Sequence, residues 1–257
     1  MSTLTDKVAV VTGGSAGIGR GIVERYLDEG CRVVFGSRGA EAGHAMVSEL
    51  AAGDRLHFVQ TDVTQQHQVE RLVDETVRIF GRVDIAVLNA GGTGRSRPVV
   101  DMPDEEWELE LNLNLNHTFW AMRRVLPHLV GQGSGRVISI SSVEGKHAKA
   151  GVAGYVANKH AINGLTKAVA KEVGPSGVTV NAICPGLVLT GLAERGAGQG
   201  LGVGGFEAVV ELYSREAALQ RPVTVDEVVA AAVMLASDAA SGITGALISV
   251  DGGTAAY

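Results

Sequence analysis

A tyrosine and a lysine four residues apart give the clearest chemical signal in this chain. The stretch Tyr155-Val-Ala-Asn-Lys159 begins thirteen residues after Ser142. Residues i and i+4 share one face of a helix, so the two side chains are expected side by side. A fixed ammonium favours the ionised form of a nearby phenol, whose pKa is otherwise about 10. We therefore predict that Lys159 lowers the pKa of Tyr155 and makes it a usable acid or base.

Ser142 ends an expected strand, and Tyr155 begins the helix that follows. This spacing can place both hydroxyl groups around one carbonyl oxygen. For reduction, Tyr155 would donate a proton and Ser142 a hydrogen bond, while a nicotinamide hydride attacks the carbon. Lys159 would also hold the ribose hydroxyls. The neighbouring Ser141 is the rival serine, but alternation along a strand turns it to the other face.

A glycine-rich turn near the N-terminus could hold the redox partner of this chemistry. Thr12-Gly-Gly-Ser-Ala-Gly-Ile-Gly19 follows one expected strand and opens a helix, which is the context that a dinucleotide-binding turn requires. Glycine lets the backbone approach a pyrophosphate, and a helix N-terminus offers unpaired N–H groups. The residues predicted to bind the dinucleotide here are Gly13, Ser15, Ala16, Gly17, Ile18 and Gly19.

The end of the second expected strand bears on which dinucleotide binds. Proteins that prefer NAD usually place an acidic residue there, to bind the ribose hydroxyls. This chain has the neutral Ser37 followed by Arg38, whose guanidinium can pair with a 2′-phosphate. The alternative is that Arg38 is a solvated surface arginine. We predict NADP(H) as the cofactor in preference to NAD(H).

Two further strand ends are candidates for cofactor contacts, because ligands of open parallel sheets bind beyond the carboxyl ends of the strands. Asp62 and Val63 follow the third expected strand, and Asn89-Ala90-Gly91 follows the fourth. Asp62 would accept a hydrogen bond from the adenine amino group, or else cap a turn. Ala90 and Gly91 would let the cofactor lie close to the backbone.

The elements that must position these residues alternate from end to end. The expected strands are Val8–Val11, Arg32–Phe35, Leu56–Val59, Val83–Leu88, Gly135–Ile140, Val178–Ile183 and Ala246–Val250. The expected helices are Gly17–Glu29, Ala40–Ala52, Gln65–Phe80, Pro103–Val130, Val152–Val173, Phe206–Gln220 and Val225–Ala236. Several strands are continuously apolar, as when both faces of a parallel sheet are covered. The pattern predicts an α/β fold, a Rossmann-like, doubly wound seven-stranded parallel sheet with helices on both faces, in a single domain over residues 1–257.

Residues typical of helix ends support these boundaries. Gly30 and Gly53 follow helices where a left-handed cap is expected. Thr224-Val-Asp-Glu227 fits a capping box that opens the last long helix.

Composition limits the classes of partner. Hydrophobic residues make up 46% of the 257 residues, the formal net charge is −6, and no run of Lys or Arg is present. These features argue against nucleic acid or an anionic membrane as the main partner. The longest apolar run, Val228–Ala236, is too short to span a bilayer, and the polar N-terminus predicts no signal peptide. Cys31 and Cys184 are expected to be buried free thiols, the scattered histidines predict no metal site, and we expect a cytoplasmic protein.

These motifs together resemble the short-chain dehydrogenase/reductase family, in its compact branch of about this length, along the whole chain. The resemblance rests on the glycine turn, Asn89-Ala90-Gly91, Ser142, Tyr155-x-x-x-Lys159 and Pro185-Gly186. It implies a catalytic asparagine seven residues after a helical tryptophan, which selects Asn114 after Trp107, to hold a water next to Lys159. It also implies that Pro185, Gly186, Val188 and Thr190 bind the cofactor, the last two at the nicotinamide carboxamide. A homotetramer built through the two long central helices and the C-terminal strand is implied as well.

The chain departs from the family pattern at several positions. Leu88 and His117 stand where many members have an asparagine and a glycine; we interpret His117 as a packing or surface residue. The C-terminal third is similar to 3-hydroxybutyrate dehydrogenases and to ketoreductases of polyketide and fatty-acid pathways. Glu144, Val152 and Leu187 replace a histidine, a lysine and a tryptophan of the former. This loss of groups suited to a carboxylate favours an uncharged or bulky ketone or alcohol as substrate.

Residues 191–220 are predicted to form a substrate lid, because Gly191–Gly205 is rich in glycine. The function predicted overall is an NADP(H)-dependent interconversion of a ketone and a secondary alcohol. The alternatives are an NAD-linked hydroxy-acid dehydrogenase, a sugar epimerase or dehydratase, and a non-catalytic dinucleotide-binding regulator. An epimerase would need an additional C-terminal substrate domain, and a regulator has little need for an intact Asn, Ser, Tyr and Lys set.

Overall fold

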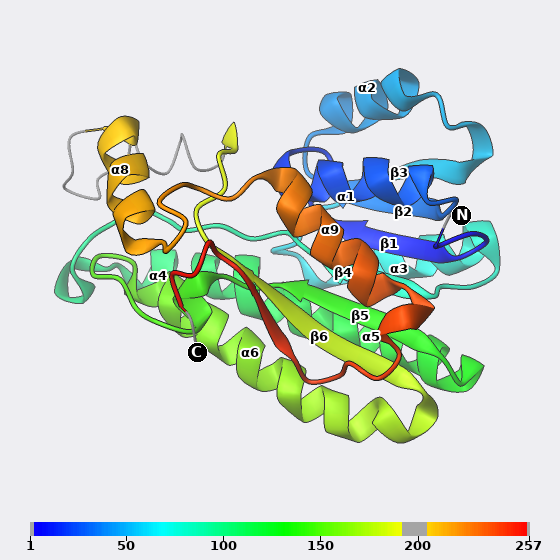
Figure 1. Cartoon of the computed structure of the whole chain (residues 1–257). Helices are drawn as coiled ribbons and strands as arrows, with labels where there is room; N and C mark the ends of the chain where they lie inside the picture. The colour runs from blue at the N-terminus through cyan, green and yellow to red at the C-terminus, as the bar shows by residue number, and fades with distance from the viewer. Residues whose placement is uncertain (1–2, 192–204, 256–257) are drawn as a thin grey trace.

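Seven parallel strands form one sheet at the centre of the molecule (Figure 1). The structure is a computed structural model that describes residues 3–191 and 205–255. The order across the sheet is β3-β2-β1-β4-β5-β6-β7, as expected for a doubly wound fold. The strands are β1 (Val8–Thr12), β2 (Arg32–Ser37), β3 (Leu56–Gln60), β4 (Ile85–Leu88), β5 (Gly135–Ile140), β6 (Val178–Pro185) and β7 (Leu247–Val250).

Helices cover both faces of this sheet. The helices are α1 (Gly17–Asp28), α2 (Ala40–Leu50), α3 (Gln66–Phe80), α4 (Asp104–Leu111), α5 (His117–Gln132), α6 (Ala153–Val173), α8 (Phe206–Glu216) and α9 (Val225–Ala236). In Figure 1, α1 and α9 pack against each other on one face, and α3, α5 and α6 lie on the other. Helix α8 stands apart from both layers, at the left edge of the view. The predicted fold class and single domain are confirmed.

Strand side chains divide between two apolar cores, one on each face. In β1, Ala9 and Val11 belong to the core under α1, α2 and α9, whereas Val10 belongs to the core under α3, α5 and α6. The strands β2 and β4 alternate in the same way, since successive side chains of a strand point to opposite faces. This double burial explains why these strands are continuously apolar.

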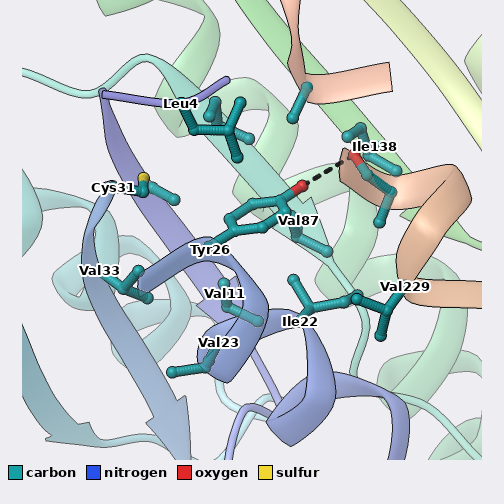
Figure 2. Packing of buried hydrophobic residues seen from close by; sticks show 14 of the residues in the cluster. Leu4, Val11, Ile22, Val23, Tyr26, Cys31, Val33, Val87, Ile138 and Val229 are labelled. Carbon is teal, nitrogen blue, oxygen red and sulfur yellow. Dashed lines mark hydrogen bonds between the residues drawn. The ribbon is translucent and has the colours of Figure 1, made fainter. Parts of the chain in front are cut away.

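A buried tyrosine anchors the first of these cores. Figure 2 shows Tyr26 of α1 surrounded by apolar side chains that include Leu4, Ile22 and Val229. Its hydroxyl group donates a hydrogen bond of 3.1 Å to the backbone oxygen of Ala232 in α9. The phenol therefore fills the core while its polar end is satisfied, and it links α1 to α9.

The order in which strands are added across the sheet reverses between β1 and β4, and a crevice opens at such a point. The connection after β1 leads to β2 on one side, and the connection after β3 crosses to β4 on the other. Because all strands are parallel, their carboxyl ends meet at the same edge of the sheet. This edge is where the sequence places the candidate site residues.

The predicted helix Pro103–Val130 is interrupted, which the sequence pattern did not reveal. Residues Asn112–Asn116 form a π-helical turn between α4 and α5. Such turns frequently lie at functional sites, because they reorient the side chains that they carry. Helix α2 ends at Leu50, earlier than expected, so Ala51 is its left-handed cap, and Gly53 adopts a left-handed conformation two residues later. Gly30 and the Thr224–Glu227 capping box behave as predicted.

Residues 192–204 of the predicted lid lie outside the described residues. In the parts of the chain that the structure describes, no helix has the length and apolar character to cross a membrane.

Candidate active site

A cavity of about 600 Å³ opens at the carboxyl ends of the strands. Most of the residues predicted from sequence to bind the cofactor or perform chemistry line it. They are Gly13, Ser15, Ala16, Gly17, Ile18, Ser37, Arg38, Val63, Asn89, Ala90, Gly91, Ser142, Tyr155, Lys159, Pro185, Gly186, Val188 and Thr190. Three predicted residues, Gly19, Asp62 and Asn114, are not among the residues that line this cavity.

The glycine-rich turn presents backbone to the cavity. Gly13 and Gly17 have φ angles of +67° and +54°, a conformation that other residues rarely adopt. Helix α1 begins after Ala16 with no side-chain cap and with no acidic residue in its first turn. Its N-terminal N–H groups and positive dipole end are therefore open to an anion in the cavity.

Gly19 is packed closely against the rest of the turn. A Cβ atom at this position would overlap the backbone oxygen of Gly13 and the side-chain nitrogen of Asn89. That same Asn89 nitrogen donates to the backbone oxygens of Thr12 and Gly13, at 3.0 and 3.1 Å. Gly19 and Asn89 together hold the turn against the end of β4, so their effect on a cofactor is to shape its binding surface.

Asp62 serves its own turn in this structure. Its Oδ1 accepts hydrogen bonds from the backbone and the hydroxyl group of Thr64, at 3.0 and 2.8 Å. The side chain lines a second cavity of about 400 Å³ beside the main one, together with Arg38 and Arg71. Of the two roles expected for Asp62, the structure shows the contacts of the turn.

The end of β2 carries an unpaired buried hydroxyl group. Ser37 is 8% exposed, and its Oγ has no hydrogen-bond partner within the protein. Arg38 follows it, is exposed, and borders both cavities. An unsatisfied buried hydroxyl beside a guanidinium is a polar site that a ribose or a phosphate group can fill.

Asn114 lies on the π-helical turn and is fully buried. Its side chain pairs with both backbone groups of Gly92, at 3.1 and 2.8 Å, and donates to the oxygen of Glu110 at 2.9 Å. A Cβ atom on Gly91 would lie 2.8 Å from Asn114 Oδ1 and 3.3 Å from Lys159 Nζ. Asn114 thus approaches Lys159 across Gly91 and holds the loop that follows β4.

Asn112 and Asn116 lie apart from this group. Asn116 donates a 2.7 Å hydrogen bond to Asn112, so the two amides pair with each other. The choice of Asn114, made through the family resemblance, agrees with this geometry.

Tyr155 and Lys159 share one face of α6, as predicted. Lys159 Nζ lies 5.3 Å from the centre of the Tyr155 ring and donates a 2.8 Å hydrogen bond to the backbone oxygen of Ile140. Lys159 is buried and Tyr155 is partly buried in the cavity wall, so desolvation acts on each charged form. Burial lowers the pKa of Lys159 to about 8.

The expected effect of Lys159 on Tyr155 is not what the structure shows. Burial raises the pKa of Tyr155 above its usual range, the charge of Glu144 raises it further, and a hydrogen bond with Ser142 lowers it. The physical reason is that the phenolate loses its water while the negative charge of Glu144 opposes its own. Tyr155 in the protein without cofactor is therefore a firmly protonated phenol.

The side chains of Ser142 and Ser141 have different partners, as strand alternation predicts. Ser142 Oγ donates a 2.7 Å hydrogen bond to Glu144 Oε2 and accepts one from the Glu144 backbone N–H at 3.2 Å. Ser141 Oγ instead donates to the backbone oxygen of Lys159 at 3.3 Å. Ser142 is the serine that shares a hydrogen bond with Tyr155.

The cavity also contains residues that sequence reasoning treated otherwise or missed. Glu144, Val152 and Leu187 line it, although they were identified only as departures from a related pattern. Val209 and Tyr213 of α8 line it as well and were not predicted. Their i,i+4 spacing on a helix within the expected lid is a signal that could have found them.

His117 and the two cysteines are structural. His117 is buried, contacts the backbone oxygen of Leu113 at 2.8 Å, and has its pKa lowered to about 4 by burial. Cys31 and Cys184 are buried free thiols, which confirms the prediction. Across residues 3–191 and 205–255, no group of three or more His, Cys, Asp or Glu is placed to hold a metal ion.

The residues present fit a bound dinucleotide. The uncapped α1 N-terminus and the positive-φ glycines suit a pyrophosphate, and the orphaned Ser37 hydroxyl suits a ribose. Gly91 leaves open a space that any Cβ would fill, next to Lys159. Tyr155, Ser142 and Lys159 stand at the other end of the same cavity, where a nicotinamide and a carbonyl could meet.

Comparison with known proteins gives matches over almost the whole chain. Residues 13–255 match the family model described as enoyl-(acyl carrier protein) reductase. The chain is 37% identical over 256 residues to 3beta-hydroxysteroid dehydrogenase 2 of Eggerthella lenta, covering 99% of this chain and 96% of that protein. It is 36% identical over 254 residues to D-beta-hydroxybutyrate dehydrogenase of Rhizobium meliloti, covering 96% and 98%.

A solved structure of similar shape adds a cofactor to the comparison. A variant of actinorhodin polyketide ketoreductase with NADPH superposes with a TM-score of 0.92 and 32% identity, covering 100% of both chains. At these identities and coverages the whole architecture is shared, and the matched proteins are named for reactions at hydroxyl or keto groups.

Proposed function

The chain belongs to the short-chain dehydrogenase/reductase family, and from that premise we propose that it interconverts a ketone and a secondary alcohol with NADP(H). Its class is that of an oxidoreductase acting on hydroxyl or keto groups. One observation carries the proposal. Tyr155, Ser142 and Lys159 converge in the cavity that also receives the uncapped α1 N-terminus.

The roles proposed for the residues follow from their positions. A bound nicotinamide dinucleotide supplies the hydride for reduction and accepts it for oxidation. Tyr155, as a protonated phenol, places its proton on the oxygen of the carbonyl that is being reduced. Lys159 and Asn114 hold the floor of the site around Gly91, and the glycine turn and Asn89 hold the pyrophosphate end. Helix α8, from the described part of the predicted lid, covers the substrate through Val209 and Tyr213.

The substrate end of the cavity favours a bulky, uncharged ketone. Val152, Leu187 and Val209 give it apolar walls, and Glu144 adds an acidic group. Among the lining residues that the structure describes, positive side chains are Arg38, at the adenosine end, and Lys159. A substrate carboxylate would meet Glu144 without a cation of its own to bind, and buried unpaired charge is costly. Together with the hydroxysteroid dehydrogenase relatives, this favours a keto-steroid or a similar polycyclic ketone.

A panel of ketones tests the proposal. With NADPH, neutral polycyclic ketones such as 3-ketosteroids should be reduced with a kcat/KM at least about tenfold above that of acetoacetate, an acidic ketone of the hydroxybutyrate type; one unfavourable buried charge exceeds that difference in free energy. Loss of reduced-nicotinamide absorbance provides the measurement. Preference for acetoacetate with NADH would instead establish the alternative, a hydroxy-acid dehydrogenase, which the 36% identical relative keeps open.

Cofactor preference has its own test at the end of β2. The Arg38→Ala variant should lose roughly tenfold in kcat/KM with NADPH, because a charge-assisted hydrogen bond to phosphate is worth about 1.5–3 kcal/mol and this arginine is exposed. Its efficiency with NADH should change little. Ser37→Asp should lower NADPH use and raise NADH use, since a carboxylate repels a phosphate and binds ribose hydroxyls.

The matched control removes an arginine elsewhere. Arg78→Ala, an exposed residue of α3 paired with Glu75, should leave both cofactors unaffected. Equal efficiency of the unmodified protein with NADH and NADPH, or better NADPH use in Ser37→Asp, would contradict the assignment of NADP(H).

We also propose that the protein is a cytoplasmic homotetramer. Buried free thiols suit a reducing compartment. Exposed apolar side chains gather on α4 and α5, where Trp107 and Phe119 are 40% and 41% exposed, and Val100 before α4 is 85% exposed. Light scattering of the purified protein gives the mass; a monomer would refute the assembly.

A further inference from the structure

A buried carboxylate stands between the serine of the site and the helix that covers it. Glu144 is 4% exposed and lies in the short helical turn Val143–Gly145. Its Oε2 accepts the hydrogen bond from Ser142 at 2.7 Å, and its Oε1 accepts one from the hydroxyl group of Tyr213 at 2.9 Å. Both oxygens of the carboxylate are therefore committed, one toward β5 and one toward α8.

The contact with Ser142 decides what the serine hydroxyl can do. A hydroxyl group has one hydrogen to donate and two lone pairs with which to accept. While Ser142 donates its hydrogen to Glu144, that hydrogen is not available to a substrate oxygen. Tyr155 is then the hydroxyl group left with a proton to give to a substrate oxygen.

The contact with Tyr213 joins this arrangement to α8. A second link lies beside it, because Lys149 Nζ pairs with Glu216 at 2.9 Å and lies 3.2 Å from the centre of the Tyr213 ring. The loop that carries Glu144 is thereby fastened to α8 at two places. The Glu144 carboxylate therefore contacts both α8, through Tyr213, and the hydroxyl group of Ser142.

We propose that Glu144 is a positioning residue that turns the Ser142 hydroxyl toward itself, places a negative charge beside Tyr155, and couples both effects to α8 through Tyr213. The proposal rests on the function proposed above. In it, Glu144 prepares the site for carbonyl reduction. A carboxylate next to a phenol opposes its ionisation. Tyr155 accordingly keeps its proton through neutral pH, whereas the reverse reaction, which needs the phenolate as base, requires alkaline conditions.

Other titratable groups lie near Glu144 and Tyr155, and the experiment must separate their effects from that of Glu144. His147 Nε2 lies 3.9 Å from Glu144 Oε1, on the same loop. Around Tyr155, Lys159 lies on its own helix, while Glu110 of α4 and Cys184 of β6 also oppose the phenolate. Burial raises the pKa values of Glu110 and Cys184 themselves, so their charged forms are disfavoured.

The first experiment titrates Tyr155 without cofactor or substrate. The ultraviolet phenolate absorbance of the protein, minus that of Tyr155→Phe, gives the pKa of Tyr155. In Glu144→Gln, this pKa should fall by roughly one unit or more, because one nearby unit charge is removed in a partly buried site. A pKa unchanged in a folded Glu144→Gln protein would overturn the proposal.

Two variants assign the effect to Glu144. Glu172→Gln removes an exposed charge at the far end of α6. The pKa of Tyr155 in this variant should equal that in the unmodified protein. His147→Gln should also leave it in place; a shift there that is absent in Glu144→Gln would assign the effect to the histidine and refute the proposal. Since these readouts need no turnover, they stand even if no ketone is reduced, which would refute the proposed function alone.

The second experiment examines the coupling to α8 by kinetics. Tyr213→Phe keeps the ring over Lys149 and removes only the hydroxyl group, so KM for the ketone should rise about tenfold, as for a lost hydrogen bond to a charged group. In Glu144→Gln, the pH at which alcohol oxidation is half-maximal should fall by the same amount as the pKa of Tyr155. If the two residues act through one contact, the double variant loses less than the product of the single effects. Multiplication of the single effects would overturn the coupling.

Discussion

Replacing Tyr155 by phenylalanine is expected to lower kcat for ketone reduction by about 10²–10⁴-fold, the usual contribution of a positioned general acid. The substitution removes the proton that the carbonyl oxygen needs and leaves the aromatic ring beside Lys159. Because the pyrophosphate end of the cavity is untouched, the dissociation constant for NADPH should stay within about threefold, less than one lost hydrogen bond. Steady-state kinetics and fluorescence titration with NADPH provide the two values.

The same substitution at another buried tyrosine controls for structural damage. Tyr26→Phe removes the hydrogen bond to Ala232 in the core shown in Figure 2 and should lower stability by about 1 kcal/mol without changing kcat. If Tyr155→Phe retained turnover near that of the unmodified protein, Tyr155 would not be the acid. If Tyr155→Phe lost NADPH binding together with turnover, the residue would have a structural role instead.

Replacing Gly19 by alanine is expected to disable cofactor binding from inside the protein. The new Cβ would overlap the oxygen of Gly13 and the amide nitrogen of Asn89, which are backbone and a hydrogen-bonded group rather than the end of a flexible side chain. Overpacking of this kind costs about 1–3 kcal/mol. The turn must shift to relieve it, so the dissociation constant for NADPH should rise at least about tenfold, as expected from misplaced charge-assisted hydrogen bonds.

Thermal unfolding gives an independent measure of the same change. A cost of about 2 kcal/mol lowers Tm by roughly 4–8 °C in a protein of this size. Gly131→Ala is the matched control, because nothing lies within 4 Å of a Cβ at this exposed position near the end of α5. It should leave NADPH binding unchanged and raise stability slightly, since alanine favours helix. Normal NADPH affinity in Gly19→Ala would show that the turn tolerates a side chain.

The acid–base behaviour of the site differs from what the spacing of its residues predicts. The spacing of Tyr155 and Lys159 correctly predicted that they share a face of α6. It could not reveal that both side chains are desolvated, or that Glu144 opposes the phenolate from a neighbouring turn. Spacing along a helix is local information, whereas burial depends on every element that packs over the site.

The π-helical turn at Asn114 is a feature of backbone geometry that local sequence information also does not reveal. The apolar and polar pattern of residues 103–130 is that of one long helix, and nothing in it marks Asn112–Asn116 as different. The turn places Asn114 so that its side chain satisfies both backbone groups of Gly92, 22 residues away. A contact over that separation is made by the folded chain and leaves no periodic trace.

For this protein, the sequence alone determined the alternation of strands and helices, the parallel sheet and most of the residues at its carboxyl edge. These features follow from side-chain periodicity, glycine positions and the rule that parallel strands end together. Only the tertiary structure showed that Gly19 packs against Gly13 and Asn89, that Asp62 accepts a hydrogen bond from Thr64, and that Tyr213 reaches Glu144 across 69 residues. The reason is that hydrogen-bond partners and dielectric environment are set by which distant segments meet, and that meeting exists only once the chain has folded.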